Sequence, residues 1–98
     1  MAQATGKSVT TTGTGASDWL QAPEGEWVLI VVWSGSAGDL DIQMGDGTTF
    51  FDMLDSSDAV VNVTDDYGVI VAGGVAYRAD VNTHTSAATL TLHRSRKA

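Results

Sequence analysis

The segment Trp27-Val28-Leu29-Ile30-Val31-Val32-Trp33 decides the fold of this chain. All seven of its residues are apolar, and four of them are valine or isoleucine, which favour strands because they branch at Cβ. Gly25 and Gly35 bound the segment, whose length is typical of a strand. Since neither face is polar, we expect a strand covered on both sides, either in the centre of a sandwich or by a subunit contact.

The segments around this strand alternate between apolar and polar residues, which is typical of half-buried strands. In residues 39–44 we expect Leu40, Ile42 and Met44 to face inward, and Gly45-Asp46-Gly47 to form a tight hairpin. The inward residues expected in the strand 75–81 are Val75, Tyr77, Ala79 and Val81. Further strands are expected at residues 8–12, 18–21, 48–54, 59–64, 69–71 and 89–93. This pattern predicts an all-β, eight- or nine-stranded antiparallel β-sandwich, jelly-roll-like in topology.

The length and composition of the chain indicate one globular domain. A chain of 98 residues with 43% hydrophobic residues holds a single core, which we place at residues 8–93, between an N-terminal arm (1–7) and a basic C-terminal tail (94–98). The sequence has no cysteine, so disulfides and thiolate metal sites are excluded. We expect no signal peptide, because residues 1–7 have no apolar core, and no membrane partner, because the longest apolar run, residues 27–33, is too short to span a bilayer. We therefore expect synthesis in a cytoplasm.

The charge distribution is strongly uneven. The chain has twelve acidic residues and five lysines and arginines, which gives a net charge of −7. No lysine or arginine lies between Ser8 and Tyr77. Such a surface repels phosphate backbones, so we expect no nucleic-acid partner. Arg94, Arg96 and Lys97 form a basic end that either docks on an acidic neighbour, including another copy of the chain, or remains solvated.

The sequence offers little for catalysis. A triad can be drawn from Ser17, His93 and an aspartate, and His84 is the second histidine, but no nucleophile motif surrounds any serine. Gly13 and Gly15 precede neither a helix nor a nearby lysine, so they are turn residues and form no phosphate loop. We expect no enzyme and no cofactor.

Several aspartates invite comparison with calcium sites. Asp39 and Asp41 share one face of a strand, Asp46 lies in the adjoining turn, and Asp65-Asp66 form another acidic turn. None of these segments has the EF-hand spacing. Outward acids on strands more often prevent edge-to-edge aggregation, and a cation at Asp39, Asp41 and Asp46 stays an alternative.

The three tryptophans allow two interpretations. Trp27 and Trp33 lie on the same side of one strand, where they form an apolar face with Leu29 and Val31, as in a core or a subunit interface. Trp19 is less constrained. The alternative is a sugar-stacking platform, as in carbohydrate-binding modules with a sandwich fold, and this alternative requires Trp19 to be exposed beside other aromatic residues.

Two segments resemble small virion proteins of tailed bacteriophages. Ser8-Val9-Thr10-Thr11-Thr12-Gly13-Thr14-Gly15-Ala16-Ser17-Asp18-Trp19 is similar to their N-terminal strand pair. Gly73-Gly74-Val75-Ala76-Tyr77-Arg78-Ala79-Asp80-Val81, followed by Thr89-Leu90-Thr91-Leu92, resembles their final hairpin. The resemblance covers about a third of the chain. It implies a β-structured capsid decoration (cement) protein, or alternatively a head-fibre or tail component.

The function that we expect is therefore structural. The resemblance implies a homo-oligomer, a trimer, that sits on the outer surface of the virion and stabilises the lattice of the major capsid protein. Contacts are expected from Trp19, Trp27 and Trp33, and electrostatic anchoring from the basic end and from Lys7 in the N-terminal arm. The alternative from a different class is a carbohydrate-binding module, and a third is a calcium-stabilised tail or fibre domain.

Overall fold

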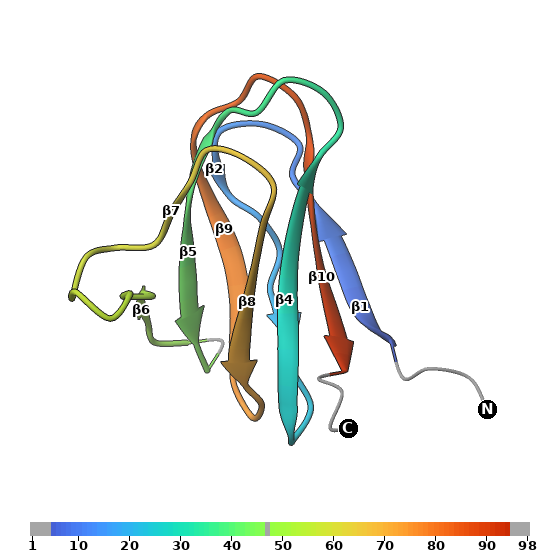
Figure 1. Cartoon of the computed structure of the whole chain (residues 1–98), viewed down its shortest axis with the longest axis vertical. Coiled ribbons are helices and arrows are strands. Elements are labelled where there is room, and N and C mark those ends of the chain that lie inside the picture. The colour runs from blue at the N-terminus through green and yellow to red at the C-terminus, as the bar shows by residue number, and fades with distance from the viewer. Residues whose placement is uncertain (1–4, 47, 95–98) are drawn as a thin grey trace.

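The chain folds into two antiparallel β-sheets that pack face to face (Figure 1). The structure is a computed structural model that describes residues 5–46 and 48–94, with the side chains of residues 5–7 left out. For Lys7 the structure therefore describes only the backbone. Arg96 and Lys97 lie outside the described residues. No helix occurs in the described ranges.

The first sheet, called sheet A below, has four strands in the order β1-β10-β4-β8. Their bounds are Thr5–Thr10 (β1), Ala88–Arg94 (β10), Glu26–Trp33 (β4) and Tyr67–Ala72 (β8). The strand with the decisive apolar segment, β4, is central, because it pairs with β10 on one side and with β8 on the other.

The second sheet, sheet B, has six strands, built around β9 and β5, which pair with each other. Its strands are Gly15–Ala16 (β2), Leu20–Gln21 (β3), Asp39–Gly45 (β5), Phe50–Asp52 (β6), Asn62–Val63 (β7) and Ala76–Thr83 (β9). Both β2 and β3 pair with β9, and both β6 and β7 pair with β5.

The predicted all-β jelly-roll sandwich is confirmed, with ten strands among the described residues in place of the expected eight or nine. The larger number has a simple cause, because β2 and β3 are two pieces of one edge strand, as are β6 and β7. With each pair counted as one, consecutive strands alternate between the sheets except at the β5–β6 hairpin, as in a jelly roll.

Two pairings implied by the resemblance are wrong. The expected final hairpin does not form, since β9 belongs to sheet B while β10 pairs with β1 and β4 in sheet A. Likewise β1 does not pair with β2, because the chain crosses from one sheet to the other after Thr10. Crossing between sheets is what lets a jelly roll bury the inner faces of both.

The core lies between the sheets and contains most of the residues predicted to face inward. Its fully buried members include Leu29 and Val31 of β4, Leu40 and Ile42 of β5, Tyr77, Ala79 and Val81 of β9, and Leu90 and Leu92 of β10. Met44 and Val75, expected inward as well, are only half-buried. Both line an open pocket at the side of the sandwich.

The expectation that β4 is covered on both faces is wrong for the single chain. Its inward residues are buried, but Val28 and Ile30 on the outer face are half-buried and Val32 is 48% exposed. Sheet A therefore has one face without a covering layer among the described residues. The alternative expectation, that a subunit contact covers the outer face of β4, stays a prediction.

Two strands are shorter than expected because aspartates cap the turns beside them. Asp46 Oδ1 accepts hydrogen bonds from the backbone N–H groups of Thr48 and Thr49, at 2.9 and 2.8 Å, so β6 begins only at Phe50. Asp55 does the same for Ser57 and Ala59, at 2.7 and 3.1 Å, which confines the next strand to residues 62–63.

Candidate functional site

Trp27 and Trp33 are core residues that also fix the ends of β4. Both side chains are buried. The indole N–H of Trp27 donates to the Pro23 carbonyl oxygen at 2.8 Å, and that of Trp33 donates to the Asp65 carbonyl oxygen at 3.0 Å. Burial with a satisfied N–H is the usual arrangement for a structural tryptophan, so neither ring is available to stack on a ligand.

Trp19 is different, because it lies outside the core in a cluster of three side chains. It is half-buried, and its ring centroid is 6.2 Å from that of Phe50, at an interplanar angle of 58°. The guanidinium of Arg78 lies over both rings, with its carbon 4.3 Å from the Trp19 centroid and 4.2 Å from the Phe50 centroid. Trp19, Phe50 and Arg78 are called the aromatic cluster below.

The strand register explains why these three residues meet on the outer face of sheet B. Gln43 is opposite Arg78 on one side and Asp52 on the other, and Trp19 directly precedes β3, which pairs with β9. A hydrogen-bonded row follows. Arg78 Nε donates to Gln43 Oε1 at 2.8 Å, and Gln43 Nε2 donates to Asp52 Oδ1 at 3.3 Å.

Arg78, Gln43 and Phe50 were not predicted as members of a site from the sequence. Arg78 was visible as the one cation of the strand 75–81, next to the inward-facing Tyr77, so alternation alone places it on the outer face. Its partners Phe50, Gln43 and Trp19 are 28, 35 and 59 residues away in sequence. No local pattern could have indicated them.

The acids considered for a cation site do not converge. Among the described residues no group of three or more histidine, aspartate or glutamate side chains is placed to hold a metal ion. Asp39 and Asp41 share Asn62 as a hydrogen-bond donor, at 2.6 and 2.9 Å, and Asn82 also donates to Asp39 at 3.1 Å. These amides, Asn82 before Asn62, lower the pKa of the Asp39 carboxyl, which stays charged without a cation.

The second acidic turn also serves the backbone. Asp66 Oδ1 accepts a hydrogen bond from the Trp33 backbone N–H at 3.0 Å, and Asp65 Oδ1 accepts from the Asp66 N–H at 2.8 Å. Asp46, in the β5–β6 turn, has a lowered pKa because the N–H groups of Thr49 and Thr48 donate to it. Each of these carboxylates has a local structural role.

The residues of the possible triad lie apart. Ser17 is on the sheet B side, where its hydroxyl accepts a hydrogen bond from the Ala79 N–H at 3.0 Å and donates to the Asp18 carbonyl oxygen at 3.0 Å. His93 belongs to β10 of sheet A, opposite Val28. His84 is exposed just after β9. The structure does not bring a serine and a histidine of this set together.

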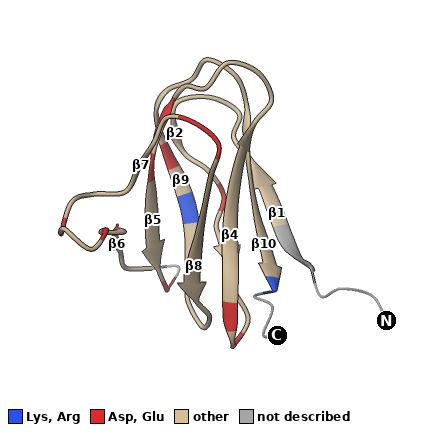
Figure 2. Cartoon of the chain, viewed as in Figure 1, with Lys and Arg blue, Asp and Glu red and all other residues tan. Residues whose placement is uncertain are grey.

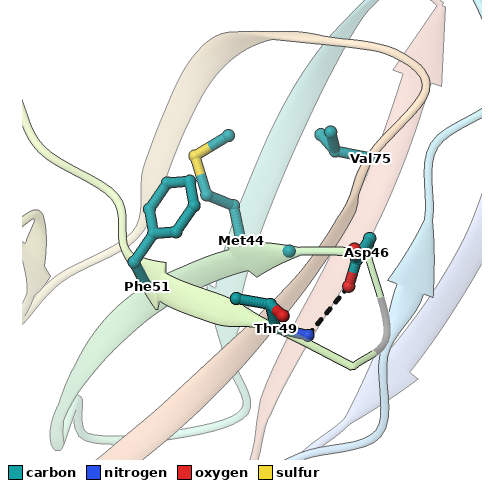
Figure 3. Close-up of a pocket in the computed structure, with 6 residues that line it drawn as sticks. Met44, Asp46, Thr49, Phe51 and Val75 are labelled. Carbon is teal, nitrogen blue, oxygen red and sulfur yellow. Dashed lines mark hydrogen bonds between the residues drawn. The ribbon is translucent and has the colours of Figure 1, made fainter.

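An open pocket of about 210 Å³ lies at the side of the sandwich, beside the β5–β6 hairpin (Figure 3). Figure 3 shows Phe51, Met44 and Val75 around it, with Asp46 hydrogen-bonded to the Thr49 backbone. The remaining lining residue is Gly45. Its surface is mostly apolar, and its one carboxylate is already occupied by backbone donors.

The outer face of sheet A carries a continuous group of apolar side chains, namely Val28, Ile30, Val32 and Ile70, called the apolar face below. Val28 and Ile70 are direct cross-strand partners, and Ile70 is 61% exposed. The neighbouring outward residues of β10 are Thr89, Thr91 and His93. Acidic residues are concentrated on sheet B and the loops, while sheet A has a single acid, at one end of β4 (Figure 2).

Of the basic residues expected to anchor the chain, the structure describes the side chain of Arg94 alone. Its guanidinium carbon lies 5.4 Å from the centroid of the Trp27 ring, at the end of β10. Arg94 therefore packs on the fold, at the rim of the sheet that carries the apolar face.

Comparison of the chain with protein-family models, curated proteins and solved structures gives no significant match. Within the described ranges, no helix is long and apolar enough to cross a membrane. The surfaces that remain as candidate sites are the two outer faces of the sandwich, one apolar and one acidic with an aromatic cluster.

Proposed function

We propose that this chain is a non-enzymatic structural protein that acts by association, and specifically a capsid decoration protein of a tailed bacteriophage. It forms a homo-oligomer, a trimer in this proposal, on the outer surface of the virion. There it stabilises the lattice of the major capsid protein by adding contact area, which favours the assembled state by mass action.

The observation that carries this proposal is the apolar face on a chain of net charge −7. Copies with that charge repel one another wherever acidic surfaces meet. Contact between copies through the apolar face would bury Val28, Ile30, Val32 and Ile70. It would cause little such repulsion, because sheet A carries a single acid (Figure 2). An exposed apolar group of this kind, rimmed by threonines, is typical of interaction sites.

The edge of sheet A supports the same proposal. β8 pairs with β4 on one side, and no described strand pairs with its other side. Its sequence, Tyr67–Ala72, contains no charge and no proline, the features that usually protect an edge strand from pairing with another chain. Ile70 lies both on this edge strand and on the apolar face, so a second copy of the chain can contact the edge and the face together.

A charge placed on the apolar face tests the proposal. Ile70→Asp adds a carboxylate where copies are proposed to meet, and Leu54→Asp is the matched control, since Leu54 is 51% exposed and lies in the segment between β6 and β7. Both residues are exposed, so each change alters the stability of the single chain by about 1 kcal/mol or less, apart from any interface. Sedimentation velocity should show an oligomer for the wild type and Leu54→Asp, and a single subunit for Ile70→Asp.

A second measurement addresses the capsid. The wild-type chain should bind expanded empty capsids of the phage that encodes it and raise their melting temperature, and Ile70→Asp should bind them more weakly. A wild-type protein that remains a folded single subunit at about 1 mM, where even millimolar affinities are populated, contradicts self-association. Failure to bind such capsids contradicts the location on the virion.

A further inference from the structure

The outer face of sheet B offers a second, chemically different surface, on the opposite side of the sandwich from the apolar face. We propose that it is a binding site for a neutral carbohydrate, centred on Trp19, Phe50 and Arg78. This inference does not depend on the proposed association through sheet A, since the two surfaces share no residue.

The aromatic cluster is rigid, as a binding site must be if ordering it is not to weaken affinity. Arg78 is held by two rings, at 4.3 and 4.2 Å, and by its Nε hydrogen bond to Gln43. Arginine has five N–H donors in a fixed plane, and the hydrogen bond from Arg78 to another described residue uses one of them. The geometry therefore presents further donors in a fixed orientation on the outer face.

Phe50 adds exposed apolar surface beside these donors. Its side chain is 48% exposed although it lies within a strand of a pleated sheet. The opposing residue on β5 is Gly45, a buried glycine at which the backbone of Thr49 and Phe50 packs too closely to admit a Cβ. A ligand with an apolar C–H surface can contact the Phe50 ring and reach Arg78 at the same time.

The charge around the cluster excludes an anionic ligand. Asp52 belongs to the same row as Arg78, and the next row of the sheet places Asp41 directly opposite Asp80. These three carboxylates outnumber the one guanidinium, so the surface repels an anion despite Arg78. A bare cation is not favoured either, because no metal-binding group of three occurs among the described residues.

The same carboxylates are strong acceptors for hydroxyl groups. Asp41 and Asp80 are like charges placed opposite each other, which is destabilising in a sheet unless donors approach them. Asn62 donates to Asp41 at 2.9 Å, and hydroxyl groups of a ligand can supply further donors. A protein partner fits less well, because aspartate is depleted in protein interfaces and three aspartates lie in these two rows.

Aromatic rings, fixed amide and guanidinium donors, and ionised acceptors without net positive charge together match one chemical class. A neutral sugar has C–H faces that pack on rings and hydroxyl groups that both donate and accept. The row from Trp19 to Asp52 crosses four segments of the chain at intervals of about 4.8 Å, so it can contact more than one sugar unit.

The two adjacent phenylalanines provide the sharpest test. Phe50 and Phe51 are both exposed, at 48% and 60%, but successive strand residues face opposite ways, and Phe51 lines the side pocket (Figure 3). Phe50→Ala and Phe51→Ala remove the same atoms from neighbouring positions. Neither residue is in the buried core, so both variants should fold, which thermal melting would verify.

The probes are cellohexaose, maltohexaose and N-acetylchitohexaose as neutral sugars, and hexagalacturonate as an anionic one, measured by calorimetry and tryptophan fluorescence. Trp27 and Trp33 are buried, so Trp19 is the tryptophan that a ligand on this face can contact. We expect at least one neutral probe to bind and to change the emission, and Trp19→Phe to abolish that change. Binding of a neutral sugar should be insensitive to salt, since the sugar carries no charge whose attraction salt could screen.

Phe50→Ala should weaken this binding by about tenfold or more, and Phe51→Ala by less than about twofold. Three results would each overturn the site: no neutral probe binding at about 5 mM, equal losses in both variants, or binding of hexagalacturonate alone. Because none of these measurements depends on oligomer formation, failure here leaves the association proposal unaffected, and the reverse also holds.

Discussion

Removing the hydroxyl group of Tyr77 tests how the two sheets are joined. Tyr77 belongs to β9 of sheet B, its side chain is buried, and its hydroxyl donates to the carbonyl oxygen of Ala72, in β8 of sheet A, at 2.7 Å. Tyr77→Phe keeps the ring in the core and removes only this bond between the sheets. The substitution therefore isolates one part-buried polar contact between the two sheets.

The expected loss at neutral pH is about 1 kcal/mol, because this part-buried hydrogen bond has the net worth of a typical intramolecular one. A domain of this size has a free energy of unfolding of roughly 5–10 kcal/mol, so the change is a measurable fraction of the total. Tyr67→Phe is the matched control. Tyr67 is only half-buried, and none of the described hydrogen bonds involves its hydroxyl, so its loss should be smaller.

The pH dependence gives a second, independent test. Burial raises the pKa of Tyr77, and burial together with the Asp55 carboxylate raises that of Tyr67. An unfolded tyrosine ionises near pH 10, so the unfolded state loses its proton first. The stabilisation is thus fully present below about pH 10 and is lost as the pH rises toward the folded pKa, at no more than ~1.4 kcal/mol per pH unit for each tyrosine.

Urea denaturation followed by tryptophan fluorescence at about pH 8, 10 and 11 measures both effects. The free energy of unfolding should fall more steeply above pH 10 for the wild type than for Tyr77→Phe, so the two proteins should differ less at pH 11 than at pH 8. Equal stability of the two proteins at pH 8 would refute the hydrogen-bond argument. Parallel pH profiles would refute the argument from the raised pKa.

Two further predictions concern close packing. Gly73→Ala should cost about 1–3 kcal/mol, because a Cβ at this position would collide with the Pro23 carbonyl oxygen and the Gly25 backbone, whereas Gly13→Ala, with open space around it, should change the thermal midpoint little. Leu90→Ala in the fully buried part of β10 should cost about 2–5 kcal/mol in urea denaturation, and Thr91→Ala on the outer face about 0.5 kcal/mol or less. Equal effects within either pair would contradict the assigned packing.

The fold was largely predictable because its signals are local. Alternation in residues 39–44 and 75–81 identifies which side chains face the core, and Leu40, Ile42, Tyr77, Ala79 and Val81 are all buried. Strand lengths were less predictable. Asp46 and Asp55 cap turns through their carboxylates, and these hydrogen bonds end or delay the strands that β-propensity alone would extend.

The aromatic cluster could not be predicted, although each of its residues is conspicuous in the sequence. Trp19 was recognised as a tryptophan that could be exposed, but its neighbours were not identifiable. Phe50 and Arg78 reach it from β6 and β9, and the contact depends on the register of β9 against β5. A shift of one residue would turn Arg78 toward the core and remove the cluster altogether.

By itself the sequence determined that the chain is a cysteine-free, acidic, all-β domain, because composition and side-chain alternation act over a few neighbouring residues. It also predicted a strand at residues 27–33, but the expectation that both faces of this strand are covered is wrong for the single chain. Only the tertiary structure decided which face of that strand is left uncovered, and which acids, amides and rings share a surface. Those properties depend on sheet order and register, which are set by contacts between segments far apart in the chain.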